Sequence, residues 1–528
     1  MPYAEDADTA RHWATERAIS CWAWFRGDLD EATLGALHTA AAASKADGAT
    51  WVMIMRPDDV PTPAEHVLAD EVVVGTSPPA PWGIFTALQA AGECDVRRMG
   101  VLGSSRASLD AAHRAGVGAV IGVATNTPAA RQPLLLAQPD VIVAPDAFAA
   151  LDAERYASGR AHRQRVLLNP GPSVVSDRVH RAVGGPDLCH REPEYSALLS
   201  GIRQKLLHIA EVPDDWALVM LAGSGTAALE AMTGAATRPG KALLVCKNGI
   251  YGERIETIAR RLSIPVVTVE ASDLEPIDPA AVAAALDAHP EVDAVAVIHH
   301  ETTTGLLNPV QEIAAVTNAR GILTLVDAIS SLGAEDLELE GTGIDFVAST
   351  SNKCLHGLPG AAFILISPRG QERIRETPPR SLYFDLSAYL RAQEKQTVPF
   401  TPSIPALYGL DAALDELLDE GVANRQALYQ ARMDYLDEAM ARLGIVARVA
   451  PELRSRSVRS MPLPEGIAYD DLHDQLKAEG YIIYAGLGNA ASTTFRVCAL
   501  GALTVEALKG FVGALEGALA ERGKMVPA

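Results

Sequence analysis

Apolar positions along the chain gather in short runs that are separated by longer amphipathic stretches. The runs are rich in Val, Ile and Leu and end in small or polar residues, a pattern typical of strands buried in a sheet. They lie at residues 216–221, 243–246, 322–326 and 345–348. Stretches between them, such as the Ala-rich residues 279–286, predict helices. Strands that alternate with helices favour an α/β fold.

Other parts of the chain show different patterns. Residues 409–443 predict one long helix that bridges into a small C-terminal domain, with strands near residues 445–447 and 481–484. The polar, Arg-rich residues 154–165 predict a linker, after which Val166 starts a new strand. A chain of 528 residues is too long for one core. We therefore expect three domains, at residues 1–160, 161–415 and 416–528.

Acidic residues outnumber basic ones. Asp and Glu total 66 and Lys and Arg total 45, a net charge of −21, which argues against nucleic acid or anionic lipid as a partner. No run of about 18 apolar residues predicts a membrane span, and the acidic residues 1–6 do not match a secretory signal. The six cysteines show no metal-ligand spacing. We therefore expect a cytoplasmic protein with reduced thiols, no membrane contact and no metal site.

Two charged residues stand where predicted strands open into loops. Asp327 ends the run 322–326, and Lys353 follows the run 345–348, 353 − 327 = 26 residues after Asp327. Ligands of open α/β sheets bind at the carboxyl ends of the strands. There a lysine can hold pyridoxal 5'-phosphate (PLP) as a Schiff base, and an aspartate can keep the pyridinium nitrogen protonated. We predict Lys353 and Asp327 as such a catalytic pair; the alternative for the lysine is a solvated surface charge.

A Gly-Ser-Gly turn supplies a candidate phosphate site. Ser224, Gly225 and Thr226 follow a predicted strand and open a predicted helix, where backbone N–H groups can reach a phosphate. Tyr251 lies among glycines after the run 243–246 and could stack on a flat ring. The alternatives are an ordinary tight turn and a buried structural tyrosine.

These features stand in the order that is typical of one enzyme family. From about Val166 to Leu519 the chain resembles the class V aminotransferases of PLP fold type I, and within them the 2-aminoethylphosphonate:pyruvate branch. The matching segments are 167–172, 223–226, 301–309, 327–331, 351–354, 400–402 and 495–497. The resemblance implies a large domain with a mixed or mostly parallel sheet and a small C-terminal α+β domain. It also implies amino transfer between 2-aminoethylphosphonate, or a close analogue, and pyruvate, giving phosphonoacetaldehyde and L-alanine, or the reverse.

The resemblance further implies roles for single residues. Lys353 would form the Schiff base and move protons, Asp327 would pair with the pyridinium nitrogen, and Tyr251 would stack on the ring. Thr302 would approach the phenolic oxygen of the cofactor, and Arg496 would clamp the acid group of the substrate bidentately. The residues implied at the cofactor phosphate are Ser224, Gly225, Thr226 and Asn352, with Thr401 acting across a homodimer, and Ser176 would add a hydrogen bond to the substrate anion.

One segment departs from the phosphonate branch. His190 and Arg191 stand in a His-Arg-Glu-Pro-Glu-Tyr run that resembles the alanine/serine:glyoxylate branch instead. An aminotransferase of that type is therefore the alternative function. His190 and Arg191 could meet the substrate, but we favour a role in ordering the surface between subunits. A cysteine desulfurase is disfavoured because residues 486–494, ahead of Arg496, contain no cysteine to accept sulfur.

The first 160 residues resemble a second family. Residues 79–85, 99–106, 115–123 and 137–143 are similar to the C-terminal half of a haloacid-dehalogenase-type Rossmannoid fold, and most closely to phosphonoacetaldehyde hydrolases. That superfamily needs an aspartate nucleophile at an early strand end and a magnesium-binding acid in a later turn. The first 60 residues offer no such Asp pair, and the later turn reads Gly103-Ser104-Ser105, whose hydroxyls would not hold the ion. We therefore expect a degenerate, non-catalytic pseudo-hydrolase domain.

The extra domain leaves the partners open. It could dock an enzyme that consumes or produces phosphonoacetaldehyde, scaffold a dimer, or bind a phosphonate as an effector. A second functional hypothesis is that the chain binds PLP but serves mainly to dock partners through this N-terminal domain. Deleting residues 1–160 and measuring turnover would separate docking from catalysis.

Overall fold

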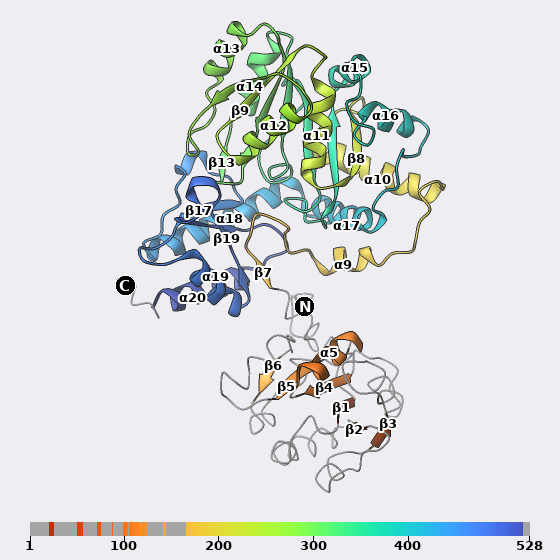
Figure 1. The fold of residues 1–528 in the computed structure, drawn as a ribbon, viewed down its shortest axis with the longest axis vertical. Coiled ribbons are helices and arrows are strands. Elements are labelled where there is room, and N and C mark those ends of the chain that lie inside the picture. Colours follow the sequence, from red (N-terminus) through yellow and green to blue (C-terminus); the bar gives the residue numbers. More distant parts are fainter. Residues whose placement is uncertain are drawn as a thin grey trace. The chain divides into compact units, whose positions relative to one another are not determined.

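The computed structural model describes residues 165–520 without a break. Before them it describes residues 21–25, 50–55, 71–74, 87, 99–103, 105–115, 117, 119–123 and 141–143. The chain divides into two compact units, Met1–Gln164 and Arg165–Ala528, which Figure 1 shows in red to orange and in yellow to blue. The predicted linker, residues 154–165, lies outside the described residues except for its last one.

The N-terminal unit contains a six-stranded sheet in which all neighbouring strands are parallel. The strand order is β3-β2-β1-β4-β5-β6, which is the order of Rossmann-type sheets. Helix α5 joins β4 to β5, and its Leu109 is buried. The bounds are β1 (Cys21–Phe25), β2 (Thr50–Met55), β3 (Glu71–Val74), β4 (Met99–Gly103), α5 (Arg106–Ala115), β5 (Ala119–Val123) and β6 (Val141–Val143).

The hydrolase resemblance of this unit stays a prediction. Strands β1 and β4, whose ends would carry the acids of an active hydrolase, contain neither Asp nor Glu. Ser105 and Ser108, near the turn after β4, hydrogen-bond each other through their hydroxyls at 3.0 Å. Ser104 and residues 79–85 lie outside the described residues.

The C-terminal unit is built on a seven-stranded sheet of order β10-β9-β11-β14-β15-β16-β8. All strands run parallel except β16, which is antiparallel to both of its neighbours. The bounds are β8 (Ala217–Gly223), β9 (Ala242–Lys247), β10 (Val266–Glu270), β11 (Val292–Ile298), β14 (Leu323–Asp327), β15 (Ile344–Thr350) and β16 (Gly360–Ile366). A mostly parallel sheet with one reversed strand agrees with the expected fold type I.

Helices cover both faces of this sheet and bury alternate strand residues. On one face, Leu218 and Val295 pack with α10 (Pro193–Ile209), α13 (Pro279–Ala288), α14 (Val310–Asn318) and α17 (Ile404–Glu420). On the other, Val219 and Ala294 pack with α11 (Gly225–Ala236), α12 (Ile250–Arg261), α15 (Pro368–Glu376) and α16 (Leu386–Glu394). Figure 1 shows the sheet between these layers. Because both faces are covered, the strands are mostly apolar.

A smaller C-terminal part packs around its own core of Met461, Phe495 and Phe511. It holds a three-stranded antiparallel sheet, β17-β20-β19, and a parallel pair formed by β18 with β7 from the start of the unit. The elements are β7 (Val166–Leu167), α18 (Val422–Arg442), β17 (Val458–Pro462), α19 (Tyr469–Ala478), β18 (Tyr481–Ile482), β19 (Tyr484–Ala485), β20 (Thr494–Cys498) and α20 (Val505–Ala520), whereas α9 (Asp177–Val183) packs on α17. No helix among the described residues is long and apolar enough to cross a bilayer.

Two element predictions are wrong. The helix predicted over residues 409–443 is two helices, α17 and α18, because Gly421 between them has a φ of 86°, which interrupts a right-handed helix. The strand predicted at residues 445–447 does not form, and the chain enters the small sheet later, at β17.

Candidate active site

The predicted site residues follow the carboxyl ends of neighbouring strands. Strands β8, β9, β11, β14 and β15 run in the same direction, so their carboxyl ends meet at one edge of the sheet. Asp327 is the last residue of β14. The others come just after a strand: Ser224, Gly225 and Thr226 after β8, Tyr251 after β9, Thr302 after β11, and Asn352 and Lys353 after β15. The predicted residues therefore lie at the edge where open α/β sheets bind their ligands.

Asp327 is a buried carboxyl with a positive side chain nearby. It is 4% exposed, and its Oδ1 accepts a hydrogen bond from the Ile329 N–H at 2.9 Å. Burial raises the pKa of Asp327 to about 6, while the charges of Lys353 and Arg254 act in the opposite direction. A further positive group beside this carboxylate would offset its desolvation, which is the environment that a pyridinium nitrogen needs.

The loop that carries Lys353 packs against the Asn-Pro-Gly-Pro segment at the start of the unit. Gly171 has a φ of 109°, and a Cβ there would lie 2.9 Å from Cδ of Lys353. Ser173 donates from its N–H to the carbonyl of Asn352 at 3.3 Å and from its hydroxyl to the carbonyl of Lys353 at 3.4 Å. The positive φ of Gly171 is a conformation that L side chains rarely adopt, which favours glycine beside the lysine side chain.

The start of α11 has the features of an anion site. Ser224 is the N-cap residue, its side chain is exposed, and it makes no capping hydrogen bond. Gly225 is buried, and a Cβ there would lie 2.5 Å from Cδ1 of Ile329. The helix start is thereby packed onto the turn that holds Asp327. Backbone N–H groups at such a start, with the helix dipole, favour a phosphate.

Tyr251 and Arg254 connect two parts of the edge. The guanidinium carbon of Arg254 lies 4.8 Å from the centre of the Tyr251 ring, and Nη1 donates to Oγ1 of Thr226 at 3.4 Å. Arg254 was not predicted as a site residue. Its neighbour in the chain, Tyr251, was visible as an aromatic between glycines, whereas the contact to Thr226 joins residues that are 28 positions apart.

Glu301 is a second buried acid that sequence reasoning missed. Its Oε1 accepts from the Thr303 N–H at 3.1 Å and from the Thr303 hydroxyl, and Oε2 accepts from the Tyr251 N–H at 3.4 Å. A Cβ at Gly249 would collide with the Glu301 side chain. Burial, together with the smaller effect of the charge of Asp327, raises the pKa of Glu301 to about 7. The only sequence feature that could have pointed to Glu301 is its place as a single acid directly before three threonines, in the segment 301–304.

Arg496 reaches the edge from the small sheet. It is 3% exposed, its Nε donates to the Ala485 carbonyl at 2.9 Å, and its Nη1 donates to the Thr302 carbonyl at 3.3 Å. The structure thus brings Arg496 and Thr302 together, although they are 194 positions apart in the chain. These two bonds fix the orientation of the guanidinium. Nη2 takes part in neither of them and can donate to a ligand.

Two predicted residues are placed differently from the rest. Ser176 caps α9 by accepting from the Val179 N–H at 3.2 Å, and it donates to Oε1 of Glu416 at 2.5 Å. Neither bond joins it to the other predicted residues, so its contact with a substrate anion stays a prediction. Thr401 is exposed and lines a hollow with Phe400 and Gly360, and its role across a homodimer stays a prediction.

Arg191 binds the segment that leads to Thr401. Its Nη1 donates to the hydroxyl of Thr397 at 3.4 Å and to the carbonyl of Val398 at 3.3 Å. This contact lies within one chain, so a role of Arg191 at the substrate or at a surface between subunits stays a prediction.

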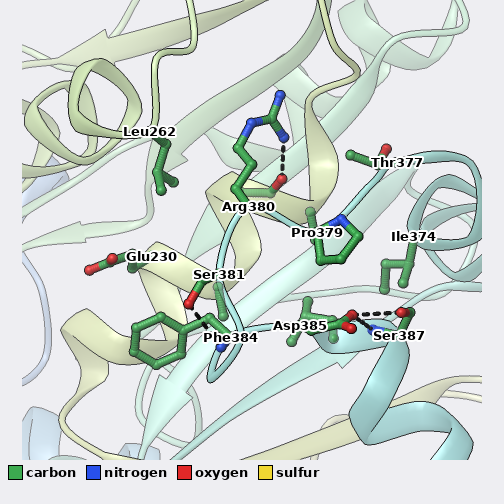
Figure 2. A pocket seen from close by; sticks show the side chains of 14 residues that line it. Glu230, Leu262, Ile374, Thr377, Pro379, Arg380, Ser381, Phe384, Asp385 and Ser387 are labelled. Atoms are coloured by element: carbon green, nitrogen blue, oxygen red, sulfur yellow. Dashed lines mark hydrogen bonds between the residues drawn. The ribbon is translucent and has the colours of Figure 1, made fainter.

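A separate hollow, shown in Figure 2, lies away from these residues. It is lined by α11, the end of α15 and the segment that leads to α16, and Arg380 donates to the Gly234 carbonyl beside it at 2.5 Å. None of the predicted site residues lines it.

The arrangement fits PLP in three ways. The buried Asp327 carboxyl suits a positive ring nitrogen, and the uncapped start of α11 suits the phosphate. Tyr251, at the same edge of the sheet and next to Arg254, offers a flat ring on which the cofactor ring can stack. Among the described residues, no three His, Cys, Asp or Glu side chains group as they would around a metal ion. Cys354 beside the lysine is buried, and burial raises its pKa to about 12.

Comparisons with known proteins give the same picture. The chain is 36% identical over 369 residues to a 2-aminoethylphosphonate–pyruvate transaminase of Burkholderia mallei, covering 68% of this chain and 98% of that protein. A transaminase of the same name from Syntrophobacter fumaroxidans is 33% identical over 361 residues, covering 67% and 96%.

Solved structures agree at the level of the fold. The alanine–glyoxylate aminotransferase of Nostoc sp. superposes with a TM-score of 0.65 at 28% identity, covering 67% of this chain and 95% of that one. The family model for "Aminotransferase class-V" matches residues 176–503. The unit has the fold of type I PLP enzymes, the family model matches residues 176–503, and the relatives are covered over 96–98% of their length. This chain therefore belongs to the class V aminotransferases and is a PLP-dependent transaminase.

Proposed function

We propose that the enzyme moves an amino group between 2-aminoethylphosphonate, or a close phosphonate analogue, and pyruvate. The products are phosphonoacetaldehyde and L-alanine, and the flux could run either way. The observation that carries the proposal is the similarity to transaminases of this name, which are 33–36% identical and are covered over 93–98% of their length.

The chain's own residues divide the work. When bound, PLP supplies an electron sink for the carbon that carries the amino group. Lys353 holds the cofactor at rest, and its Nζ then moves the proton of the amine-bearing carbon. Asp327 holds the proton on the ring nitrogen, and Tyr251 orients the ring. The residues proposed to bind the remainder of the cofactor are Ser224, Gly225, Thr226, Thr302, Asn352 and Thr401.

Arg496 is proposed to bind the acid group of both substrates. Its Nε is committed to the Ala485 carbonyl, so the guanidinium meets an anion with its Nη1 and Nη2 end. A planar fork at this end matches two oxygens of a phosphonate or a carboxylate. One rigid arginine can therefore serve the phosphonate donor and the carboxylate acceptor in turn.

A substrate panel tests the proposal. The purified enzyme is mixed with 2-aminoethylphosphonate, L-alanine or L-serine, and the loss of the cofactor's visible absorption band is followed, with pyruvate or glyoxylate then restoring it. We expect 2-aminoethylphosphonate and L-alanine to react and pyruvate to restore the band. Reaction with L-serine and glyoxylate alone would instead establish the alanine/serine:glyoxylate type.

We also propose that the enzyme is a cytoplasmic homodimer whose active sites need both subunits. Thr401 is exposed in the single chain, close to the stacked rings of Tyr383 and Phe400, whose centres lie 4.9 Å apart. Leu382, next to this cluster, is 83% exposed. Contiguous exposed apolar groups mark interaction sites, and we propose that Leu382 with Tyr383 and Phe400 forms such a contact.

The N-terminal unit is proposed to be non-catalytic and to serve a partner, such as an enzyme that consumes or produces phosphonoacetaldehyde. The support is the parallel sheet whose strands β1 and β4 lack acids. Deleting residues 1–160 should leave kcat and KM for the amino transfer within about twofold of the full chain, because the proposed catalytic residues all lie after residue 165. A loss of turnover would show instead that the unit supports catalysis.

A further inference from the structure

The small sheet places a second side chain beside Arg496. In the register of β20 with β19, Arg496 stands directly opposite Tyr484, and in the register of β20 with β17 it stands opposite Ser460. Directly opposed residues of antiparallel strands point to the same face of a sheet. Ser460, Arg496 and Tyr484 therefore form a row across one face.

This face is turned away from the core of the small part. Phe495 and Val497, on either side of Arg496, belong to that core, as does Ile483 next to Tyr484. Side chains alternate along a strand, so Arg496 and Tyr484 point the other way. The Nη1 of Arg496 reaches the Thr302 carbonyl, which shows that the row faces the edge of the large sheet where the site lies.

Tyr484 has a free polar end at this position. The guanidinium carbon of Arg496 lies 5.9 Å from the centre of the Tyr484 ring, close enough for the ring to pack beside it. Tyr484 is 39% exposed, whereas Arg496 is 3% exposed. In the part of the chain that the structure describes, no hydrogen bond is shown for the Tyr484 hydroxyl, while the nearby Tyr469 hydroxyl donates to the Ile483 carbonyl at 2.9 Å.

A phosphonate and a carboxylate make different demands on such a row. A carboxylate has two oxygens, which the Nη1 and Nη2 end of one guanidinium can serve. A phosphonate has three oxygens arranged as a tetrahedron, so the same arginine leaves one of them without a protein donor. A phenol hydroxyl beside the guanidinium can donate to that third oxygen, and hydrogen bonds to charged acceptors are stronger than neutral ones.

We propose that Tyr484 is a specificity-determining residue that binds the third oxygen of a phosphonate held by Arg496. The inference rests on the proposed function, because it concerns how the same site tells the phosphonate substrate from the carboxylate substrate. It assigns Tyr484 to the phosphonate alone and leaves the binding of carboxylates to Arg496.

The test uses Tyr484→Phe in the full-length holoenzyme. The variant keeps the ring beside Arg496 and removes only the hydroxyl. Two unreactive ligands of equal chain length, ethylphosphonate and propionate, are titrated by calorimetry, so the readout does not depend on turnover. We expect the Kd of ethylphosphonate to rise about 10-fold or more and that of propionate to change by less than about twofold.

Tyr481→Phe is the matched control. Tyr481 lies on β18, three residues from Tyr484 in the same small part, and its ring packs near Phe511 at 5.9 Å between centres. Its hydroxyl does not belong to the row, so we expect neither affinity to change. The same three proteins are then compared in kcat/KM for 2-aminoethylphosphonate and for L-alanine, where only Tyr484→Phe should lower the first value.

Each outcome decides a separate point. An unchanged affinity for ethylphosphonate in Tyr484→Phe overturns the role of Tyr484 while 2-aminoethylphosphonate turnover by the wild type still supports the proposed function. Equal losses for both ligands mean that Tyr484 only holds Arg496 in place, which also overturns it. A wild-type enzyme that neither binds ethylphosphonate nor reacts with 2-aminoethylphosphonate shows that the proposed function itself is wrong.

Discussion

At the scale of single residues, burial raises the pKa of two buried acids, that of Asp327 to about 6 and that of Glu301 to about 7. Asp327 has the charges of Lys353 and Arg254 nearby, which favour its ionised form. Glu301 receives hydrogen bonds from Thr303 and Tyr251 but stands next to the charge of Asp327, which disfavours a second negative charge. Both carboxyls are therefore expected to titrate closer to neutral pH than exposed carboxyls do. The Glu301 carboxyl accepts hydrogen bonds from Tyr251 and Thr303.

The variant Glu301→Gln should change how stability depends on pH. The pKa of Glu301 in the folded chain, about 7, lies above its ordinary value of 4.5. Its contribution is thus fully present below about pH 4.5 and is lost as the pH rises through about 7, a change on the order of 3 kcal/mol. Gln does not titrate, so the stability of the variant relative to the wild type should rise over this window.

Urea unfolding of the cofactor-free proteins at a series of pH values measures this difference. Glu312→Gln is the control, because Glu312 is exposed in the first turn of α14. Its stability curve should run parallel to that of the wild type. If Glu301→Gln also runs parallel, the Glu301 carboxyl does not change its ionisation on folding in this window.

At the scale of elements, the site depends on how the start of α11 packs against the turn after β14. Gly225→Ala should weaken PLP binding about 10-fold, because a Cβ would lie 2.5 Å from Cδ1 and 2.9 Å from Cγ1 of Ile329. Relief of that contact moves either the helix start or the turn that positions Asp327. The dissociation constant comes from titration of the cofactor-free protein with PLP, followed by absorbance.

Two further variants separate the clash from a general loss of stability. Gly201→Ala changes a helical glycine of α10 whose Cβ would meet nothing within 4 Å, so it should raise stability by about 0.5–1 kcal/mol and leave PLP affinity unchanged. Adding Ile329→Val to Gly225→Ala should recover part of the affinity. Full PLP affinity in Gly225→Ala alone would mean that the packing of α11 on this turn does not position the cofactor.

The elements also show which features a sequence can predict. Strand ends could be read from apolar runs followed by polar residues, so Asp327, Lys353 and the Ser224 turn were found at one sheet edge. The contacts of Arg254 with Thr226 and of Glu301 with Tyr251 could not be read from the sequence. Each contact joins residues at the ends of different strands, and only the strand order of the sheet brings those ends together. The single helix predicted over residues 409–443 was wrong because its periodicity continues on both sides of Gly421, where the backbone turns.

At the scale of the whole molecule, the proposed homodimer concerns Thr401. Thr401 is exposed in the single chain and lines a hollow with Phe400 and Gly360, and we expect it to reach the cofactor phosphate of a second copy. Arg191 holds the neighbouring Thr397 and Val398, so the segment is ordered before a partner arrives. Preordering lowers the entropy that association must overcome.

Leu382→Glu should therefore separate the subunits and remove activity together. Leu382 is 83% exposed beside the stacked Tyr383 and Phe400, and a buried charge without a partner would oppose the contact there. Val446→Glu is the matched control, since Val446 is also strongly exposed, at 63%, but lies in the small part. Sedimentation velocity should give a monomer for the first variant and a dimer for the second and the wild type. A dimeric and active Leu382→Glu protein would place the subunit contact elsewhere, and Thr401 could then no longer be assigned to the neighbouring site on the ground of this surface.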